Sequence, residues 1–229
     1  MYPAEADIRQ IAMNGQHAEL AWKDEGVPVS TRFDDPYFSL EDGLAETRHV
    51  FIDGNDLRAR AQAGFHIAEL GFGTGLNLLA TLEALCGVPG PIRYTSFEAY
   101  PIPRADAERA LRAFPELDAS GLLAHWGQER FALGALEVEI ILGDARTTLP
   151  HWDGQADAWY LDGFSPARNP ELWTDTLMAE VGRHTKAGGS FATYTAAGHV
   201  RRALAAAGFT VTRAPGYGRK RHMSRGHKA

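Results

Sequence analysis

Apolar and polar residues alternate along this chain with two different periods from residue 65 to the C-terminus. Short apolar runs bounded by turn-forming residues predict strands at 65–70, 93–98, 138–142, 156–161, 190–193, 210–213 and 219–223. Stretches with helical spacing between them predict helices at 76–85, 104–113, 173–184 and 200–207. This order predicts an α/β, Rossmann-like fold with a seven-stranded, mostly parallel sheet and helices on both faces. Ligands of such sheets bind at the carboxyl ends of the strands, where the strand order reverses.

The first 60 residues follow a different pattern. Residues 18–22 and 26–30 are two short apolar segments separated by polar residues and a glycine, which predicts a small hairpin. Aromatic and apolar residues then stand between acidic ones at 33–38 and 49–52. We therefore expect an N-terminal extension, residues 1–60, packed on a main domain formed by residues 61–229.

A glycine-rich turn connects the first predicted strand of the main domain to its first helix. It reads Glu-Leu-Gly-Phe-Gly-Thr-Gly-Leu-Asn over residues 69–77. Glycines let the backbone bend sharply and approach a ligand, and the free N–H groups of the helix start favour a carboxylate or a phosphate. The spacing G-x-G-x-G differs from the dinucleotide fingerprint G-x-G-x-x-G, and an acid precedes the first glycine. The motif therefore favours S-adenosylmethionine, which offers an ammonium and a carboxylate, over a simple tight turn. The residues predicted to bind this cofactor are Glu69, Gly71, Gly73, Thr74, Gly75 and Asn77.

Acidic residues also end the next two strands. Glu98 stands where a carboxylate accepts hydrogen bonds from both ribose hydroxyls of an adenosine, and bonds to a charged group contribute roughly 1.5–3 kcal/mol each. Asp144 follows a glycine at the end of the third strand. Its carboxylate is predicted either to accept from the adenine amine or to cap the helix that begins at residue 145.

The fourth strand ends in Asp162, followed by Gly163 and Phe164. Asp162 is the predicted catalytic residue, because this strand end lies beside the glycine turn in the expected sheet. A carboxylate at this point orients an amine nucleophile and takes up its proton. Because a carboxylate also favours the charged, non-nucleophilic amine, we expect Asp162 to bind and aim the amine more than to deprotonate it. The upstream segment Asp-Asp-Pro-Tyr-Phe, residues 34–38, resembles the D-P-P-Y signature of amino methyltransferases, but it ends no predicted strand.

Composition and charge limit the kinds of function that the sequence supports. The formal net charge of −6 argues mildly against nucleic acid, yet the segment from residue 213 onward carries six arginines and lysines and no acid. That segment is predicted to be either a cationic surface or a solvated tail. One cysteine, Cys86, excludes an internal disulfide, and the nine histidines have no metal-binding spacing, so no metal is expected. The sequence has no signal peptide and no run long enough to span a bilayer, so we expect a cytoplasmic location and no membrane partner.

Seven segments together resemble one family, the tRNA 5-aminomethyl-2-thiouridine methyltransferases, or MnmC-type methyltransferase domain. The longest of them are FDDPYFSLEDGLAETRHVFIDGNDL, WYLDGFSPARNPELW and AGFTVTRAPGYGRKRHM; ELGFGTGLNLL, SFEAYP, the Gly-Asp pair at 143–144 and TYTAAGHVRR complete the match. The resemblance covers nearly the whole chain. It makes the Asp-Pro-Tyr-Phe segment part of the family's N-terminal arm.

The resemblance implies a class I S-adenosylmethionine-dependent methyltransferase fold and methyl transfer to the 5-aminomethyl nitrogen of the tRNA wobble uridine. It implies Asp162 as the catalytic acid and a tRNA anticodon loop as the partner, with the target base turned out of the loop. The residues expected to contact the substrate are Phe164, Pro166, Arg219, Lys220 and Arg221. His222 stands where the family often has an acid, and no flavin domain follows residue 229, so we expect no FAD.

Three other interpretations remain open at this point. A class I methyltransferase acting on a small-molecule or protein amine would share the cofactor site but bind no tRNA. An NAD-dependent oxidoreductase is disfavoured by the glycine spacing. An RNA-binding module without turnover is disfavoured by the intact glycine turn.

Overall fold

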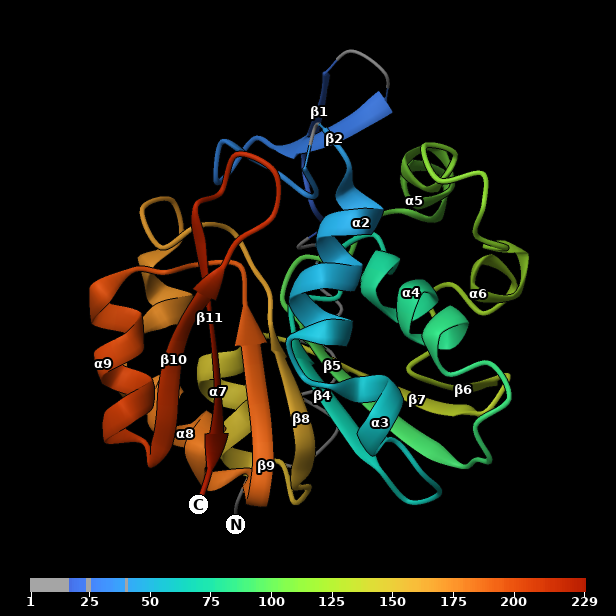
Figure 1. The fold of residues 1–229 in the computed structure, drawn as a ribbon. Helices are drawn as coiled ribbons and strands as arrows, with labels where there is room; N and C mark the ends of the chain where they lie inside the picture. The colour runs from blue at the N-terminus through green and yellow to red at the C-terminus, as the bar shows by residue number, and fades with distance from the viewer. Residues whose placement is uncertain (1–16, 24–25, 40) are drawn as a thin grey trace, which may run out of the picture.

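The computed structural model describes residues 17–23, 26–39 and 41–229. Its centre is an eight-stranded sheet with the order β10-β11-β9-β8-β4-β5-β7-β6 (Figure 1). The strands are β4 (His66–Leu70), β5 (Ile92–Glu98), β6 (Arg130–Leu133), β7 (Leu136–Leu142), β8 (Ala156–Leu161), β9 (Thr185–Thr193), β10 (Phe209–Pro215) and β11 (His222–Lys228). The pairs β9-β8, β8-β4, β4-β5 and β5-β7 are parallel, whereas β6 and β11 run antiparallel to their neighbours. The predicted Rossmann-like fold class is confirmed, with one more strand than expected.

The additional strand is β6, which forms a tight antiparallel hairpin with β7 at the edge of the sheet. Residues 130–133 alternate between exposed and half-buried, so they lack the continuous apolar run that marked the central strands. A short amphipathic segment at a sheet edge gives a weak sequence signal.

The last strand is predicted at 219–223, but in the structure β11 begins only at His222. The antiparallel register of β10 and β11 pairs Pro215 with His222, so residues 216–221 form the turn between the two strands. Gly218 adopts a φ of 56° in this turn, a conformation that glycine adopts without strain. Arg219, Lys220 and Arg221 consequently lie on the turn and not in a strand.

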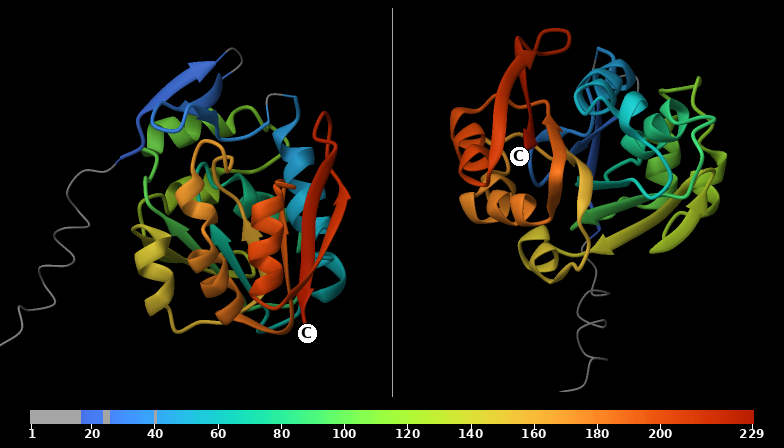
Figure 2. Two further views of the ribbon diagram at one scale, coloured as in Figure 1. Left: turned by 90° about the vertical axis from the view of Figure 1, so that its left-hand side faces the viewer. Right: turned by 60° about the horizontal axis from the view of Figure 1, so that its bottom comes forward.

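Helices cover both faces of the sheet, as Figures 1 and 2 show. They are α2 (Gly43–Thr47), the π-helix η2 (Arg48–Asp53), α3 (Leu57–Arg60), α4 (Leu76–Ala84), α5 (Arg104–Leu111), α6 (Ser120–Ala124), α7 (Ala145–Thr148), α8 (Asp175–Arg183) and α9 (Gly198–Ala206), with 3-10 turns η3 (Leu149–His151) and η4 (Pro170–Trp173). Among the described helices, none is long and apolar enough to cross a bilayer.

The helix predicted at 173–184 is divided in the structure. Thr174 has an extended backbone and its hydroxyl accepts a hydrogen bond from Leu177 N, so α8 begins only after it. Trp173 belongs to the preceding 3-10 turn, where its indole N–H donates to the carbonyl of Phe164. This bond ties the turn to the loop that follows β8.

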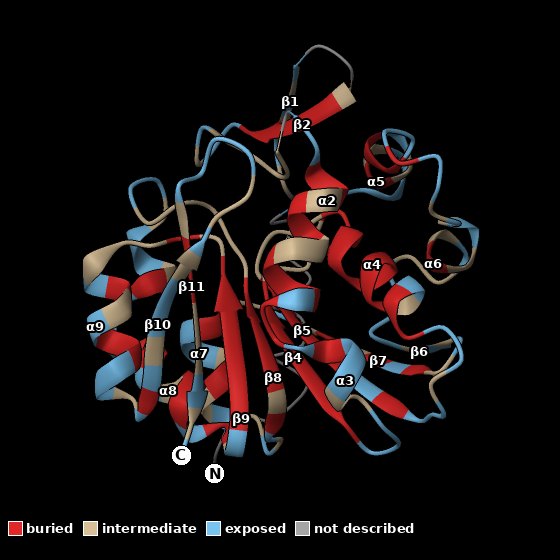
Figure 3. Cartoon of the chain, in the orientation of Figure 1, coloured by how far each residue is buried: buried red, intermediate tan, exposed pale blue. Residues whose placement is uncertain are grey.

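The two faces of the sheet hold two separate cores because successive strand residues point to opposite sides. On β8, Ala158 and Tyr160 face one core, whereas Trp159 and Leu161 face the other. Strands buried on both sides account for the nearly continuous burial of the central strands in Figure 3.

The N-terminal residues form a three-stranded sheet and a helical segment. Strands β1 (Leu20–Lys23) and β2 (Val27–Ser30) pair antiparallel, which confirms the predicted hairpin, and β2 also pairs with β3 (Asp35–Pro36). This small sheet lies beyond the carboxyl ends of the central strands, at the top of Figure 1. The helical segment from 43 to 60 contributes Val50, Phe51, Ile52 and Leu57 to the core on the α4 side. The chain therefore passes over the strand ends before the central sheet begins.

Candidate functional site

A cavity of about 500 Å³ opens at the carboxyl ends of β4, β5 and β8. Its volume falls within the roughly 300–1,000 Å³ of small-molecule sites. β4 lies between β5 and β8, so the strand order reverses at this point, where doubly wound folds bind ligands. The wall also includes residues of the N-terminal segment and of the β10–β11 turn. Ten of the sequence-predicted residues line the cavity: Gly71, Gly73, Thr74, Asn77, Glu98, Asp144, Asp162, Phe164, Arg219 and Lys220.

The glycine turn requires glycine for two reasons. Gly71, Gly73 and Gly75 have φ values of 88°, 53° and 76°, which side chains rarely tolerate. A Cβ at Gly71 would also lie 2.8 Å from the backbone carbonyl oxygen of Asp162. The turn and the loop after β8 are therefore in direct contact, and a ligand on the turn lies next to Asp162.

Glu98 ends β5 and fixes the glycine turn. Its Oε2 accepts a hydrogen bond from Gly73 N at 2.9 Å, and its Oε1 accepts one from Tyr100 N at 2.6 Å. Burial raises the pKa of Glu98, and these backbone hydrogen bonds oppose that rise. Each carboxylate oxygen keeps a second lone pair, so the same group suits the hydroxyls of a ribose.

Asp144 is the N-cap of α7: its Oδ1 accepts from Arg146 N at 2.9 Å. The Arg146 guanidinium also pairs with this carboxylate and lowers its pKa. Of the two roles predicted for Asp144, the helix cap is therefore present in the structure. The carboxylate still borders the cavity.

Asn77 connects two carboxyl groups at the centre of the site. Its side-chain nitrogen donates to Asp162 Oδ2 at 2.7 Å and to Glu69 Oε1 at 2.8 Å. Its oxygen accepts from the Thr47 hydroxyl at 3.1 Å, which fixes the orientation of the amide. One residue of α4 thus joins the ends of β4 and β8.

The two carboxyl groups have raised pKa values. Burial raises the pKa of Asp162 to about 6; the Asn77 hydrogen bond and the charge of Lys220 lower it, and the charge of Glu46 raises it. Burial raises the pKa of Glu69 to about 8, against the hydrogen bond from Asn77. Glu69 is fully buried and does not border the cavity. Its contact with the site is through Asn77.

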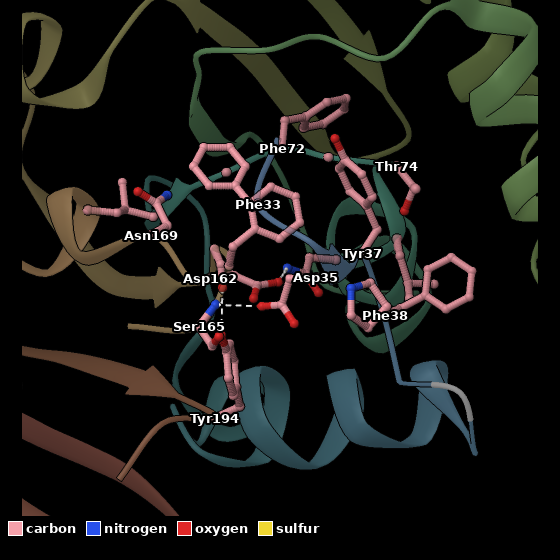
Figure 4. A pocket seen from close by; sticks show the side chains of 18 of the residues that line it. Phe33, Asp35, Tyr37, Phe38, Phe72, Thr74, Asp162, Ser165, Asn169 and Tyr194 are labelled. Carbon is pink, nitrogen blue, oxygen red and sulfur yellow. Dashed lines mark hydrogen bonds between the residues drawn. The ribbon is translucent and has the colours of Figure 1, made fainter. Parts of the chain in front are cut away.

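The N-terminal segment supplies site residues that the sequence pattern did not identify. Asp35 Oδ2 accepts a hydrogen bond from Ser165 N at 2.7 Å, drawn as a dashed line in Figure 4. The Phe33 ring stacks on Phe164 with centroids 4.7 Å apart, and Tyr37 meets the edge of the same ring at 5.0 Å. The Asp-Asp-Pro-Tyr-Phe segment therefore lies against the loop that carries Asp162. Two features of the sequence pointed to this segment: its likeness to the D-P-P-Y signature and its place in the family's N-terminal arm.

Glu46 and Tyr194, together with the predicted residue Lys220, complete the wall beside Asp162. Glu46 is 8% exposed and comes from α2. The Tyr194 hydroxyl donates to Gly163 O at 2.7 Å, and Figure 4 shows its ring beside the Ser165 loop. Lys220 Nζ pairs with Glu46 Oε1 at 2.7 Å. Glu46 and Tyr194 lie in segments that resemble the family but were not predicted as site residues, whereas Lys220 was predicted to contact the substrate.

Four predicted residues lie outside the cavity wall: Glu69, Gly75, Pro166 and Arg221. Gly75 acts at the start of α4, where a Cβ would lie 2.7 Å from the side chain of Leu122. Arg221 is exposed on the β10–β11 turn.

Three comparisons relate this chain to known proteins. A family model described as S-adenosyl-L-methionine-dependent methyltransferase matches residues 112–229. The chain is 44% identical over 231 residues to the tRNA 5-methylaminomethyl-2-thiouridine biosynthesis bifunctional protein MnmC of Chromobacterium violaceum, covering 93% of this chain and 35% of the relative. The protein of the same name from Pseudomonas savastanoi pv. phaseolicola is 44% identical over 228 residues, covering 92% and 34%. The chain therefore spans about a third of the length of these relatives.

Solved structures share the fold. The crystal structure of MNMC2 from Aquifex aeolicus superposes with a TM-score of 0.71 at 23% identity, over 99% of this chain and 78% of that chain. Precorrin-6y C5,15-methyltransferase from Geobacter metallireducens superposes with a TM-score of 0.53 at 12% identity, over 90% and 96%. Both are similar to this chain in the arrangement of the sheet and helices.

Proposed function

This chain belongs to the S-adenosyl-L-methionine-dependent methyltransferase family, and we propose that it methylates the 5-aminomethyl nitrogen of the wobble (2-thio)uridine of tRNA, giving 5-methylaminomethyl-2-thiouridine. The names of the relatives that match 93% and 92% of the chain support this substrate. The observation that carries the proposal is the contact between the glycine turn and the Asp162 loop, which brings a carboxylate next to the expected position of the cofactor.

The residues of the cavity fit the cofactor of the family. The open N–H groups at the start of α4 suit its carboxylate, Glu98 suits the ribose, and Asp144 suits the adenine amine. When bound, S-adenosylmethionine supplies an electrophilic methyl carbon on a sulfonium, and the carbon–sulfur electron pair stays on sulfur as the new nitrogen–carbon bond forms.

Asp162 then has the role of positioning the amine. Its carboxyl is ionised above about pH 6, so near neutral pH it accepts a hydrogen bond from the substrate ammonium. That ammonium would lose one proton, by way of this carboxylate, to water, which leaves a nitrogen lone pair directed toward the glycine turn. The product of the transfer would be a secondary ammonium. Holding the two reacting atoms in line supplies much of the rate in such transfers.

Aromatic residues at the cavity suit the target base. Phe33 and Phe164 present stacked rings at the wall, and single bases turned out of an RNA loop are commonly bound by stacking on such rings. Arg219 is exposed at the rim on the β10–β11 turn, where it pairs with Glu41, and its guanidinium has further N–H donors that suit a phosphate group.

The test is methyl transfer from labelled S-adenosylmethionine to tRNA from cells that lack this activity, followed by nucleoside analysis. We expect a new 5-methylaminomethyl nucleoside with the wild-type chain. The Asp162→Asn variant is expected to lose at least about a hundredfold in turnover, with cofactor affinity retained in calorimetry. Cofactor binding without any methylated nucleoside would contradict the tRNA substrate and favour a small-molecule or protein amine.

A further inference from the structure

The side chain of Lys220 lies on the cavity wall at the β10–β11 turn and is 44% exposed. Its ammonium lies 2.7 Å from Glu46 Oε1 and 4.3 Å from the centre of the Tyr194 ring. Carboxylates and aromatic faces both attract cations, and the attraction to a ring strengthens when water is excluded. The ammonium is thus held by a carboxylate and a ring on the wall of the proposed active site.

The site that holds the Lys220 ammonium is connected by a hydrogen bond to the loop that carries Asp162. The Tyr194 hydroxyl donates to Gly163 O, so the ring that contacts Lys220 is bonded to the residue after Asp162. The charges of Lys220 and Glu46 also act on the Asp162 carboxyl. An ammonium bound here is therefore within electrostatic range of the group proposed to aim the amine.

Glu46 is more buried than an ordinary surface partner of a lysine. It is 8% exposed, and its Oε1 is fully buried and makes no hydrogen bond of good geometry among the described residues, although Lys220 Nζ is close. A buried carboxylate oxygen without a well-aligned donor is costly. Glu46 Oε1 can therefore still accept a hydrogen bond from a donor that is better aligned than Lys220 Nζ.

A role as a phosphate contact fits Lys220 less well than it fits its neighbour. Both residues pair with a carboxylate, but the side chains of Arg219 and its partner Glu41 are 91% and 47% exposed, whereas those of Lys220 and its partner Glu46 are 44% and 11% exposed. A primary ammonium on a methylene is also the chemical group that the proposed substrate carries. Lys220 and a 5-aminomethyl group thus both carry a primary ammonium, which Glu46 and the ring of Tyr194 attract.

We propose that Glu46 and the ring of Tyr194 form the ammonium subsite for the substrate amine, and that Lys220 occupies this subsite in the free protein and leaves when the substrate amine enters. The proposal rests on the proposed function for the identity of the amine. The turn that carries Lys220 contains Gly218 at a φ of 56° and Gly216, where a Cβ would clash with the Lys220 carbonyl oxygen. An uncharged group in the same position would not displace Lys220.

The direct test is NMR of protein labelled at the lysine ε-carbons. The chain has only four lysines, Lys23, Lys186, Lys220 and Lys228, and Lys220→Met assigns the signal. Because Lys220 lies over the face of Tyr194, its ε-proton signal is expected upfield, and this shift should disappear in Glu46→Gln and in Tyr194→Leu. Lys186 is the internal reference, since it pairs with Asp157 at 2.6 Å away from the cavity.

Displacement is read from the same spectra by titration with methylammonium chloride and with 5-aminomethyluridine. We expect the Lys220 signal to move to its ordinary position while the Lys186 signal stays. Equal concentrations of sodium chloride and of uridine should leave both signals in place. An unshifted Lys220 signal in the free protein, or equal responses to uridine and to 5-aminomethyluridine, would overturn the proposal even if a variant fails to fold.

Kinetics separate the subsite from a phosphate contact. Lys220→Met removes the occupant, so the KM for tRNA carrying the aminomethyl group should fall by about threefold or more, because no displacement is needed. Arg219→Gln, the adjacent control, should raise the KM. Equal rises in both variants would contradict the subsite. The NMR result needs no methyl transfer, so a failed tRNA assay with a displaced Lys220 would contradict the proposed function alone.

Discussion

Asn77 Nδ2 lies 2.7 Å from Asp162 Oδ2, and the same nitrogen also donates to the fully buried Glu69. The side-chain amide of Asn77 therefore holds the predicted catalytic carboxylate of Asp162 with one hydrogen. It donates its other hydrogen to Glu69, which lies outside the cavity wall. Rotation of Asp162 away from the cavity would break this bond. The rigidity of the Asp162 side chain consequently depends on residues of two other elements, β4 and α4.

Replacing Asn77 by alanine should shift the pH dependence of turnover. A hydrogen bond to a charged group contributes roughly 1.5–3 kcal/mol, so its loss should raise the pKa of Asp162 by roughly 1–2 units. The lower limb of the kcat–pH profile should move toward higher pH by that amount. Thr47→Val removes only the bond to the Asn77 oxygen and should move the profile much less. A uniform loss of rate with an unmoved profile would mean that Asn77 serves stability alone.

Glu98 should account for a large part of the cofactor affinity. Two hydrogen bonds from ribose to its carboxylate would contribute several kcal/mol, so Glu98→Ala should weaken S-adenosylmethionine binding by at least about tenfold. Titration calorimetry measures the change directly. Glu139→Ala is the matched control, because Glu139 lies on the adjacent strand β7 and pairs with Arg130 at the surface. Equal affinities in wild type and Glu98→Ala would rule out the ribose contact.

Glu69 should make stability depend on pH near neutrality. Its pKa of about 8 in the folded protein lies above the ordinary 4.5. The stability that this group contributes is therefore fully present below about pH 4.5 and is lost as the pH rises through about 8. The slope reaches at most about 1.4 kcal/mol per pH unit.

The interval from about pH 7.5 to 8.5 isolates this effect. His66 has a pKa lowered to about 4 by burial in the folded protein and an ordinary value of 6.5 in the unfolded chain, so it is neutral in both states across that interval. Asp162, at about 6, has largely ionised. Urea unfolding should show a free energy of unfolding that falls across the interval in wild type. Glu69→Gln, which keeps the acceptor for Asn77, should flatten the curve; parallel curves would show that Glu69 is ionised throughout.

The residues at the strand ends were predictable because the carboxyl ends of parallel strands meet at one edge of a sheet. Glu69, Glu98, Asp144 and Asp162 each follow an apolar run, and three of them border the cavity as expected. Glu69 does not, because the strand register turns its side chain beneath the turn toward Asn77. The alternation of side chains along a strand predicts on which face of the sheet a residue lies, but not which residue forms a hydrogen bond with it.

The remaining wall depends on contacts between residues far apart in the sequence. Asp35 meets Ser165 across 130 positions, and Glu46 meets Lys220 at the opposite end of the chain. Neither segment has a helical or strand period that predicts this position. The basic segment is predicted to be a cationic surface or a solvated tail. The contact of Lys220 with Glu46 depends on the turn between β10 and β11, where the sequence pattern predicts part of a strand.

Asp35 and Asp34 offer a test of how the N-terminal segment orders the catalytic loop. Asp35 Oδ2 accepts a hydrogen bond from Ser165 N at 2.7 Å, whereas Asp34 pairs with Arg168 at 3.0 Å between exposed side chains. Exposed ion pairs contribute little to stability, but loss of the Asp35 bond leaves the Ser165 amide without its acceptor. In Asp35→Ala, hydrogen exchange at Ser165 should become at least about tenfold faster, with lower turnover and nearly unchanged cofactor affinity. Asp34→Ala should leave the exchange rate near that of wild type. Equal exchange at Ser165 in the two variants would show that the loop after β8 is ordered by its own contacts, such as the Trp173 bond to Phe164.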